Sequence, residues 1–595
     1  MPAPRRLYPL LVLAVAAVVF LGCMVSPPSL MDDVDAVQGQ IARNMLDSGD
    51  WVTPHLNGIA YMEKAPLKYW MMAGAFKIFG VHDWASRIPV SGSAVLLCWL
   101  VFLIGRWAFS ERAGAYAGII LATCTGLFLF TRFQIPDAIL TTTITLAMWA
   151  FLRSLDEQEV RPRLWSAVMF AAIGTGLLIK GLIAAVFPIA AAVLFLLFTG
   201  DWRARSTWHR LNVIPGIAIL LLIAAPWHIL ATLRNPPYLD FTMHSGPGEY
   251  RGFFWFYFFN EHILRFMNLR YPRDYNTVSR PLFWAFHLLW LFPWSVYLPA
   301  IAKLRFRDPH DRAARTRLLC LCWTGFLLTF FTFSSTQEYY SMPCYPALAL
   351  LLGSALTDHH AHAWIRRGQI ALAAISSIAA LAIAAILAQV ANLPAPGDIS
   401  QALTTQQTDA YTLSLGHMGD LTIAAFAYLR APLILAGLAF AIGAITAVRR
   451  QILGAAIMMV LFFHAARLAL VVFDPYLTSE PLAEALNQAP HGTLILDNQY
   501  YTFSSVVFYA EKYHGERVLL LNGRVNNLEY GSHAPGAPQD VFIDDEQFRE
   551  RWLSDALFYI CVEGPALARL QGLVGKHRLY KIVESGGKFV FANHV

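Results

Sequence analysis

Residues 7–26 read LYPLLVLAVAAVVFLGCMVS, an uncharged apolar run near the start of a 595-residue chain. A helix of about 20 apolar residues is long enough to cross roughly 30 Å of hydrocarbon. Comparable runs recur as far as residue 472, and the composition is 57% hydrophobic and 14% charged. Soluble chains are about 25% charged. The sequence therefore predicts an α-helical integral membrane protein.

The apolar runs are separated by short polar or charged connections. Lys180-Gly181 and Pro188 interrupt the stretch 164–199, which we therefore count as two spans. This interpretation predicts 13 transmembrane helices: 7–26, 84–105, 113–130, 138–155, 164–181, 182–199, 211–232, 281–302, 318–334, 340–357, 369–390, 428–447 and 451–472.

Lys and Arg residues gather in alternate connections, which indicates the orientation. Short cytoplasmic loops carry an excess of these residues, so the N-terminus is expected in the cytoplasm and the C-terminus in the periplasm. The same cytoplasmic anchors account for the net charge of +6, and no nucleic-acid partner is expected. The first span is longer than a signal-peptide core, and we expect it to be retained. The outward segments are 27–83, 131–137, 233–280, 391–427 and the tail.

The tail, residues 473–595, has a different texture from the preceding 472 residues. Residues 493–497, 517–521 and 557–562 are typical of strands, and 504–512 and 565–574 of helices. A hairpin is expected at 577–592, turning at Gly586-Gly587, and an irregular loop at 526–540. Alternating strands and helices favour a small periplasmic α/β domain, which we interpret as a packing or acceptor-docking module.

Acidic residues are concentrated in two of the outward segments. Asp32, Asp33 and Asp35 follow the first span, and Asp137 lies in the short segment 131–137. Carboxylates at this position can act as general bases or as metal ligands. They can also cap a helix, since Asp suits the positive end of the helix dipole. Because one Asp suffices for a cap, the sequence favours Asp33 or Asp35, together with Asp137, as catalytic residues.

Two cations in the outward segments are candidates for holding a phosphate. Lys64 follows the first acidic group, and Arg265 lies in the segment 233–280. Arg binds phosphate in a bidentate way and Lys as a point charge. Glu63 and His262 are candidate ligands for a divalent metal. The aromatic run 253–259 (FFWFYFF) is typical of a helix lying at the membrane interface.

Several of these motifs together resemble a known family. The acidic start, Gly49-Asp50-Trp51 and the stretch 61–70 (YMEKAPLKYW) resemble the first outer loop of GT-C type glycosyltransferases that use polyprenyl-phosphate sugars. The similarity is greatest to the aminoarabinose transferases that modify lipid A, and protein O-mannosyltransferases are more distant. It covers roughly residues 30–357. It implies further substrate-site candidates, namely Asp32, Tyr61, Arg132, Tyr339, Tyr340 and Tyr345.

The chain departs from the family pattern in two places. The first acidic motif is Asp-Glu in the family and DDVD at residues 32–35 here, so the matching carboxylates stay open between Asp33 and Asp35. The family's Glu-Lys-Pro-Pro is EKAP at residues 63–66. The acceptor-facing residues do not match well enough to carry over the sugar or the acceptor.

The resemblance and the loop chemistry together imply a bacterial inner-membrane glycosyltransferase with a periplasmic active site. Its partners would be a polyprenyl phosphate-linked sugar donor, a lipid or protein acceptor and membrane lipids. The sequence shows no nucleotide fingerprint, so no nucleotide cofactor is expected. Two other classes compete, a lipid or polysaccharide transporter or flippase and a non-catalytic envelope-assembly scaffold. Arg430, His464 and Arg467 in the last spans are the residues that could mark a lipid path.

Overall fold

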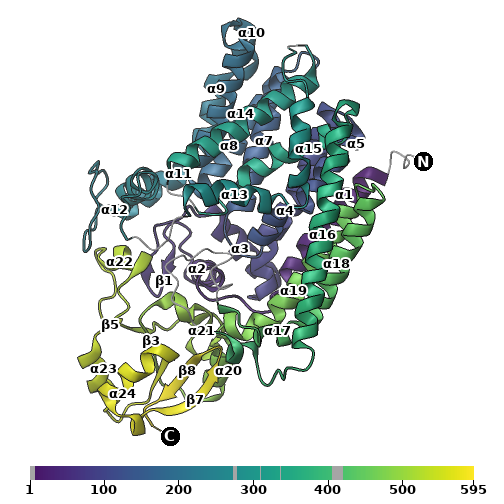
Figure 1. Cartoon of the computed structure of the whole chain (residues 1–595). Helices are drawn as coiled ribbons and strands as arrows, with labels where there is room; N and C mark the ends of the chain where they lie inside the picture. Colours follow the sequence, from purple (N-terminus) through teal and green to yellow (C-terminus); the bar gives the residue numbers. More distant parts are fainter. Residues whose placement is uncertain (1–6, 273–277, 309, 335–336, 405–419, 595) are drawn as a thin grey trace.

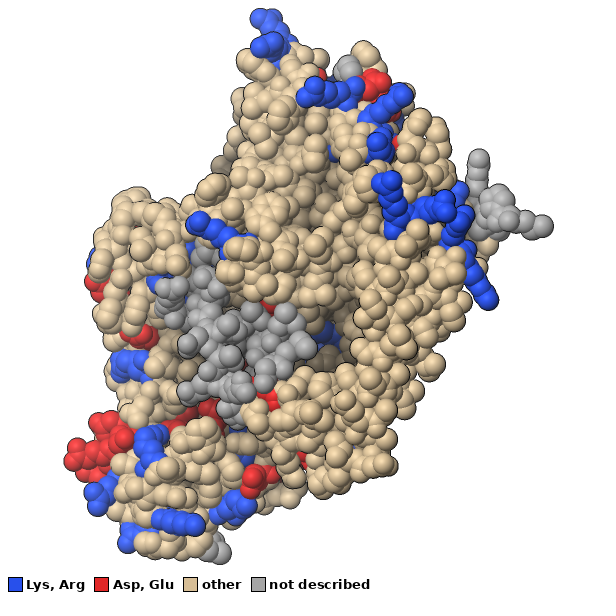
Figure 2. All heavy atoms as spheres, in the orientation of Figure 1, with Lys and Arg blue, Asp and Glu red and all other residues tan. Residues whose placement is uncertain are grey.

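The computed structural model describes the chain except residues 1–6, 273–277, 309, 335–336, 405–419 and 595. A large bundle of helices forms one part of the molecule, and a smaller part with a β-sheet, formed by the last hundred or so residues, lies at one end of it (Figure 1). Figure 2 shows a broad band of uncharged surface over the helices, with Lys and Arg gathered beyond it at the end far from the sheet. This distribution is that of a multi-pass membrane protein.

Nine helices among the described residues are long and apolar enough to cross a membrane. Each coincides with one of the predicted spans, and helix α8 ends at Lys180 beside Gly181, as expected. The nine are η1 joined to α1 (Leu7–Met24), α4 (Asp83–Ala108), α7 (Asp137–Leu155), α8 (Pro162–Lys180), α10 with α11 (Arg205–Arg234), α14 (Arg312–Phe333), η6 with α16 (His359–Val390), α18 (Arg430–Val448) and α19 (Gly454–Leu477).

The other four predicted spans are helical but short or broken. Helix α9 (Ile183–Thr199) continues through Pro188, contrary to our expectation of an interruption there. The predicted span 281–302 is a pair, α13 (Arg280–Trp290) and η4 (Trp294–Lys303), bent by 96°. The remaining two are α5 (Glu111–Ala122) with α6 (Thr125–Phe130), and η5 (Met342–Cys344) with α15 (Tyr345–Ala355). The count of 13 therefore stays a prediction.

The segment after the first span folds into α2 (Asp35–Ser48), the two-stranded hairpin of β1 (His55–Leu56) and β2 (Ile59–Ala60), and α3 (Leu67–Phe79). It lies between the helical bundle and the sheet (Figure 1). The aromatic run forms α12 (Gly252–Phe254) and η3 (Trp255–Leu264). Much of the run, including Trp255 and Tyr257, is buried against Tyr530 and neighbouring side chains, so it is more than an interfacial belt.

The tail contains a six-stranded sheet in the order β5-β4-β3-β6-β8-β7. The first four strands are parallel, and the hairpin β7–β8 pairs antiparallel to β6. Their bounds are β3 (Thr493–Asp497), β4 (Leu519–Leu521), β5 (Phe542–Ile543), β6 (Phe558–Glu563), β7 (Tyr580–Ser585) and β8 (Lys588–Ala592). The tail thus contains both helices and strands, and the periplasmic α/β domain stays a prediction. The expected loop at 526–540 instead begins with helix α22 (Asn526–Ser532), and β5 and helix α23 (Asp545–Trp552) were not predicted.

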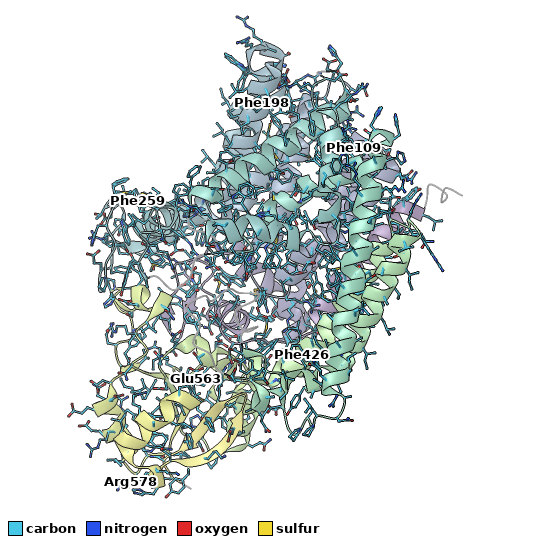
Figure 3. The ribbon with its side chains drawn as sticks, in the orientation of Figure 1. Phe109, Phe198, Phe259, Phe426, Glu563 and Arg578 are labelled. Carbon is cyan, nitrogen blue, oxygen red and sulfur yellow. The ribbon has the colours of Figure 1, made fainter. Side chains whose placement is uncertain are left out.

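The segment after the first span and the tail share one hydrophobic core. Val37 and Ile41 of α2 and Tyr69 of α3 are buried in the same cluster as Leu496 and Val506 of the tail. Figure 3 shows the size of the whole assembly, with Phe198 at the far end of the bundle and Arg578 at the far end of the sheet. Since apolar contacts join the two segments, the tail helps to hold the loop that carries Glu63 and Lys64.

Candidate active site

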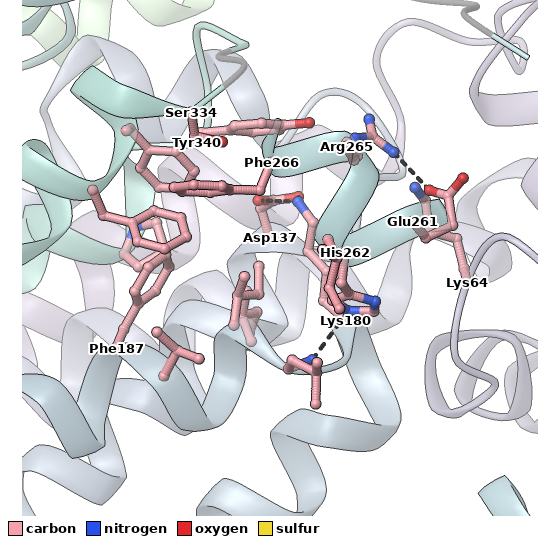
Figure 4. A pocket seen from close by; sticks show the side chains of 18 of the residues that line it. Lys64, Asp137, Lys180, Phe187, Glu261, His262, Arg265, Phe266, Ser334 and Tyr340 are labelled. Carbon is pink, nitrogen blue, oxygen red and sulfur yellow. Dashed lines mark hydrogen bonds and ion pairs between the residues drawn. The ribbon is translucent and has the colours of Figure 1, made fainter. Parts of the chain in front are cut away.

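A cavity of about 440 Å³ opens where the outward loops meet the helical bundle. Its size is typical of small-molecule sites, which span about 300–1,000 Å³. One end is polar and brings together Lys64, Asp137, Lys180, Glu261 and Arg265 (Figure 4). The other wall is apolar and is formed by Leu182, Ile183, Val186, Phe187, Phe266, Phe330 and Phe331. The cavity therefore suits a ligand with a charged head and a hydrocarbon part.

Among the residues that the structure describes, four cations and three carboxylates form a network at the polar end. Lys64 pairs with Glu63, and Arg265 lies 2.8 Å from Glu261 and 3.6 Å from Glu63. Arg270, which is fully buried, pairs with the other oxygen of Glu261. The pair Lys180–Asp137 completes the network. The polar end thus presents the cations Lys64, Lys180 and Arg265 to a ligand in the cavity.

Glu63 stays ionised within this network. Burial alone would favour its neutral form, but Lys64, Arg270 and Arg265 together outweigh burial and hold the pKa of Glu63 well below its usual range. The hydroxyl of Tyr61 donates to the second carboxylate oxygen of Glu63 at 2.8 Å. Glu63, itself bound by Tyr61, thus fixes the position of Lys64, and both Glu63 and Lys64 line the cavity.

Asp137 and Lys180 form the second half of the polar end. Asp137 is the first residue of α7 and Lys180 the last of α8. The Lys180 Nζ lies 2.6 and 2.7 Å from the two oxygens of Asp137 and about 5.1 Å from the ring centres of Tyr339 and Tyr340. The role of Lys180 was not predicted. The available signal was a single Lys at the end of an apolar span, on the same outer side of the membrane as Asp137.

Only some of the predicted tyrosines line the cavity, and Arg132 lies outside it. Tyr339 and Tyr340 line the cavity. Tyr345 is buried nearby, with its hydroxyl 3.4 Å from that of Ser341. The guanidinium of Arg132 lies over the ring of Phe128 and donates to the backbone of Ser26, outside the cavity. Tyr345 and Arg132 therefore do not face the same ligand space as Lys64.

The three acids of the first motif do not line the cavity, contrary to our expectation that they share a site with Asp137. Asp32 lies 2.6 Å from Lys588 of strand β8 and accepts hydrogen bonds from Ser505 and Ser479. Asp33 is exposed and has a positive φ of 72°. Asp32 thus connects the segment after the first span to the tail, a role that needs a partner more than 400 residues away.

Asp35 is completely buried at the start of α2. It accepts a hydrogen bond from the backbone N–H of Gln134, in the short segment that leads to Asp137, at 2.8 Å. Burial raises the pKa of Asp35 to about 6, opposed by Arg87, Gln134 and Lys68. Burial lowers the pKa of Lys68, on α3, to about 7. Asp35 therefore holds the segment 131–137 in position from outside the cavity.

The predicted metal ligands already have partners within the chain. His262 Nδ1 bonds to the Tyr257 carbonyl at 2.6 Å, and its Nε2 accepts the N–H of Leu182 at 3.1 Å. Burial lowers the pKa of His262 to about 4. With both ring nitrogens engaged and Glu63 bound by cations, these two residues do not fit a divalent metal as they lie. The metal therefore stays a prediction, and no step below depends on it.

Comparison with known proteins places this geometry in context. A family model described as dolichyl-phosphate-mannose-protein mannosyltransferase matches residues 63–230. The undecaprenyl phosphate-alpha-4-amino-4-deoxy-L-arabinose arabinosyl transferase 1 of Pseudomonas fluorescens is 31% identical over 58% of each chain. The corresponding transferase of Pseudomonas aeruginosa is 30% identical over 54% of each chain. The chain thus matches somewhat over half the length of these relatives.

The solved structures extend the likeness to the whole chain. The crystal structure of ArnT from Cupriavidus metallidurans bound to undecaprenyl phosphate superposes with a TM-score of 0.76, 22% identity and 98% coverage of both chains. The chain has the ArnT fold. An archaeal oligosaccharyltransferase from Archaeoglobus fulgidus is more distant, with a TM-score of 0.50, 12% identity and 74% of its chain covered. The resemblance read from the sequence is supported by the family model and the related transferases, and the likeness of fold covers the tail as well as the bundle.

Proposed function

We propose that this protein is a glycosyltransferase of the bacterial inner membrane that moves a sugar from a polyprenyl phosphate to a lipid or protein acceptor on the periplasmic side. The observation that carries the proposal is the two-sided cavity, polar at Lys64, Lys180 and Arg265 and apolar along α9 and α14. A polyprenyl phosphate has the matching division, with an anionic head on a long hydrocarbon chain. The names of the related transferases point to the same donor class.

The cations would act on the phosphate as the sugar leaves it. Transfer breaks the bond between the anomeric carbon and the phosphate oxygen, and the bond electrons stay on that oxygen as negative charge. Preorganised cations stabilise charge that develops in a transition state. Lys64 and Arg265 would contact the phosphate. Lys180 also lines the cavity, and an ammonium group has three donors, of which Asp137 takes two.

The acceptor would form its bond to the anomeric carbon from the face opposite the phosphate, so the configuration inverts. Both oxygens of Asp137 face the Nζ of Lys180, so Lys180 fixes this carboxylate at the wall of the cavity, and the proton that the acceptor loses would pass to the departing phosphate. We therefore assign Asp137 to positioning Lys180 and orienting the acceptor. Asp35, behind the cavity, is assigned to positioning the segment 131–137.

Release of polyprenyl phosphate tests the proposal directly. Purified protein would be given undecaprenyl phosphate-4-amino-4-deoxy-L-arabinose, the donor named for the relatives, and an acceptor-containing membrane extract. Wild type should release undecaprenyl phosphate, and Lys64→Ala should not. Lys581→Ala, an exposed lysine on the tail, is the matched control. A transporter would move the intact donor between vesicle leaflets without cleavage, and a scaffold would do neither.

The orientation of the chain is a separate part of the proposal. The alternation of Arg-rich connections supports an orientation with the tail and the polar end of the cavity on the periplasmic side. A reporter that is active only in the periplasm should therefore be active when fused after residue 595. Activity of a cytoplasm-only reporter at the same position would reject this orientation.

A further inference from the structure

Two arginines near the end of the first span have no acidic partner. Arg132 follows α6, and Arg467 lies on the last span, α19. Among the residues that the structure describes, no carboxylate lies within 4.0 Å of either guanidinium. Both contact the segment 22–26, where the chain leaves the first span: Arg132 donates to Ser26 O, and Ser26 Oγ donates to the Arg467 carbonyl.

Arg132 is only 3% exposed and is incompletely satisfied. One Nη donates to Ser26, while its Nε and second Nη are buried without a hydrogen-bond partner in the chain. Burial, together with the charges of Arg467 and Arg87 and against the opposing effect of Cys23, lowers the pKa of Arg132 to about 10. An unpaired buried charge is costly, so an anion beside it would be strongly favoured.

Arg467 lies beside Arg132 and is also without a partner. Its Nε is buried and unbonded, and no hydrogen bond from its guanidinium is found among the described residues. The guanidinium packs against Gly22, where a Cβ would come within 2.0 Å of one Nη. The stacked rings of Phe128 and Phe463, 3.9 Å apart, hold α6 against α19. This packing brings together the elements that carry the two arginines, and the charge of Arg467 acts on Arg132.

A nearby arginine shows what ordinary compensation looks like. Arg87 donates to the carbonyls of Met24, Pro27 and Ser29, which belong to the irregular segment after the first span. Its charge also acts on Asp35, Asp83 and Asp474. Satisfying loop carbonyls and neighbouring acids thus accounts for Arg87. Within the described part of the chain, the Nε of Arg87 is also buried without a hydrogen-bond partner, but acids act on the charge of Arg87, whereas no carboxylate is among the groups that act on Arg132.

The surroundings of the pair are apolar and open to lipid. Four exposed side chains lie on the two elements that flank it, with exposed fractions of 48% for Leu21, 62% for Val25, 45% for Leu468 and 46% for Val471. Charged residues within transmembrane segments mark functional sites by default. We propose that Arg132 and Arg467 bind the phosphate of an anionic phospholipid, whose acyl chains cover these four side chains. This site is separate from the cavity at Lys64 and does not rest on the proposed transferase activity.

Lipid binding to delipidated protein tests the proposal. Protein purified in a neutral detergent would be titrated with dioleoylphosphatidylglycerol, and native mass spectrometry and the thermal unfolding midpoint would be recorded. The wild type should bind at least one lipid tightly and unfold at a higher temperature. Arg467→Gln should weaken that binding about tenfold or more, since a hydrogen bond between charged groups is lost. Arg449→Gln, an exposed arginine after α18, should leave the binding unchanged.

Three further results decide the chemistry. Dioleoylglycerol, which has the same chains without phosphate, should give neither bound lipid nor stabilisation, and inorganic phosphate alone should give no shift. Arg467→Lys should retain part of the affinity because it keeps the charge, and it serves as the test if Arg467→Gln fails to fold. Equal lipid binding by the wild type and Arg467→Gln would overturn the proposal. So would equal stabilisation by dioleoylglycerol or by inorganic phosphate.

Discussion

The two acidic motifs of this protein contain the same residue type at the same membrane surface, yet they do different work. Asp137 points into the cavity and holds Lys180 through both oxygens. Asp32 points away from the cavity and binds Lys588 of the tail. Both carboxylates are nearly buried against a lysine. What each carboxylate can do depends on the position of its lysine. Lys180 lines the cavity, whereas Lys588 belongs to the tail.

This difference shows that charge in an outer loop of a membrane protein is not by itself a catalytic signature. In the first motif, Asp32 joins two parts of the chain, Asp33 lies at a turn and Asp35 supports the segment 131–137 from behind. The second motif reaches the cavity because α7 begins at Asp137 and α8 ends at Lys180, and both residues line the cavity. Five predictions follow this contrast from the largest expected effect to the smallest.

Lys64→Ala should produce the greatest loss of donor turnover. Removing one preorganised donor to developing charge lowers kcat by about 10²–10³ in other enzymes. The residue lies on a loop and its side chain is 24% exposed, so the variant should fold. Lys64→Arg should recover part of the rate, because the charge survives while the geometry changes. Normal donor kinetics in well-folded Lys64→Ala would remove this residue from the site.

Asp137→Asn and Lys180→Met should each lower turnover by about 10²-fold or more. The loss of turnover in the double variant should be much smaller than the product of the two single losses. Groups that act as one unit are not additive, and the Nζ–Oδ distances of 2.6 and 2.7 Å make them one unit. A complete cycle of kcat/KM values measures the coupling. Full multiplication of the two effects would show that they act separately, and full activity of Asp137→Asn would make Asp137 a structural anchor.

Asp32→Asn should weaken folding and spare turnover per folded molecule. Breaking a buried ion pair costs about 3–5 kcal/mol when one charge is left behind, and Asp32 and Lys588 have side chains only 8% and 11% exposed. The double variant Asp32→Asn/Lys588→Met should recover part of the thermal midpoint. Loss of turnover in folded Asp32→Asn, at unchanged stability, would return this residue to the active site.

The free energy of unfolding that Asp35 contributes should fall as pH rises toward the pKa of Asp35 in the folded protein. Its pKa is raised to about 6 in the folded state, so between its ordinary value and pH 6 the folded protein binds more protons than the unfolded chain. The stability contributed by the protonated form is lost over this window, by at most about 3 kcal/mol. Asp35→Asn cannot ionise, so its thermal midpoint relative to wild type should improve from pH 4 to pH 6.5. A pH-independent difference would contradict the raised pKa.

Asp33 should give the smallest effect of the group. Its φ of 72° lies in the left-handed region, where Asn and Gly are tolerated and β-branched residues are not. Asp33→Asn should therefore leave folding and turnover near wild type, and Asp33→Val should cost about 1–2 kcal/mol of stability through the backbone alone. A large loss of turnover in Asp33→Asn, at normal stability, would restore Asp33 as a catalytic candidate.

Patterns that depend on nearby residues were predictable from the sequence. Span length and charge alternation located the nine clear membrane helices, and Gly586-Gly587 marked the hairpin of β7 and β8. Lys64, Asp137 and Arg265 were found because they are polar residues in short outward segments. The family resemblance added Tyr339 and Tyr340, which also line the cavity.

Contacts between distant residues were not predictable in this way. Lys180 looked like a helix end, because its partner Asp137 is 43 residues away. Asp32 looked catalytic, because Lys588 is 556 residues away. The broken helix pair α13–η4, bent by 96°, has the apolar length of one span, so length and composition could not reveal the bend.

Binding of undecaprenyl phosphate to the wild type and two variants tests most directly the claim that the polar end of the cavity binds the ligand and that Asp32 only joins the chain to its tail. Radiolabelled undecaprenyl phosphate would be titrated into the wild type, Lys64→Ala and Asp32→Asn, with the folded fraction of each measured in parallel. The account predicts that Lys64→Ala loses about tenfold or more in affinity and that folded Asp32→Asn binds as the wild type does. Wild-type affinity in Lys64→Ala, or a comparable loss in folded Asp32→Asn, would contradict it.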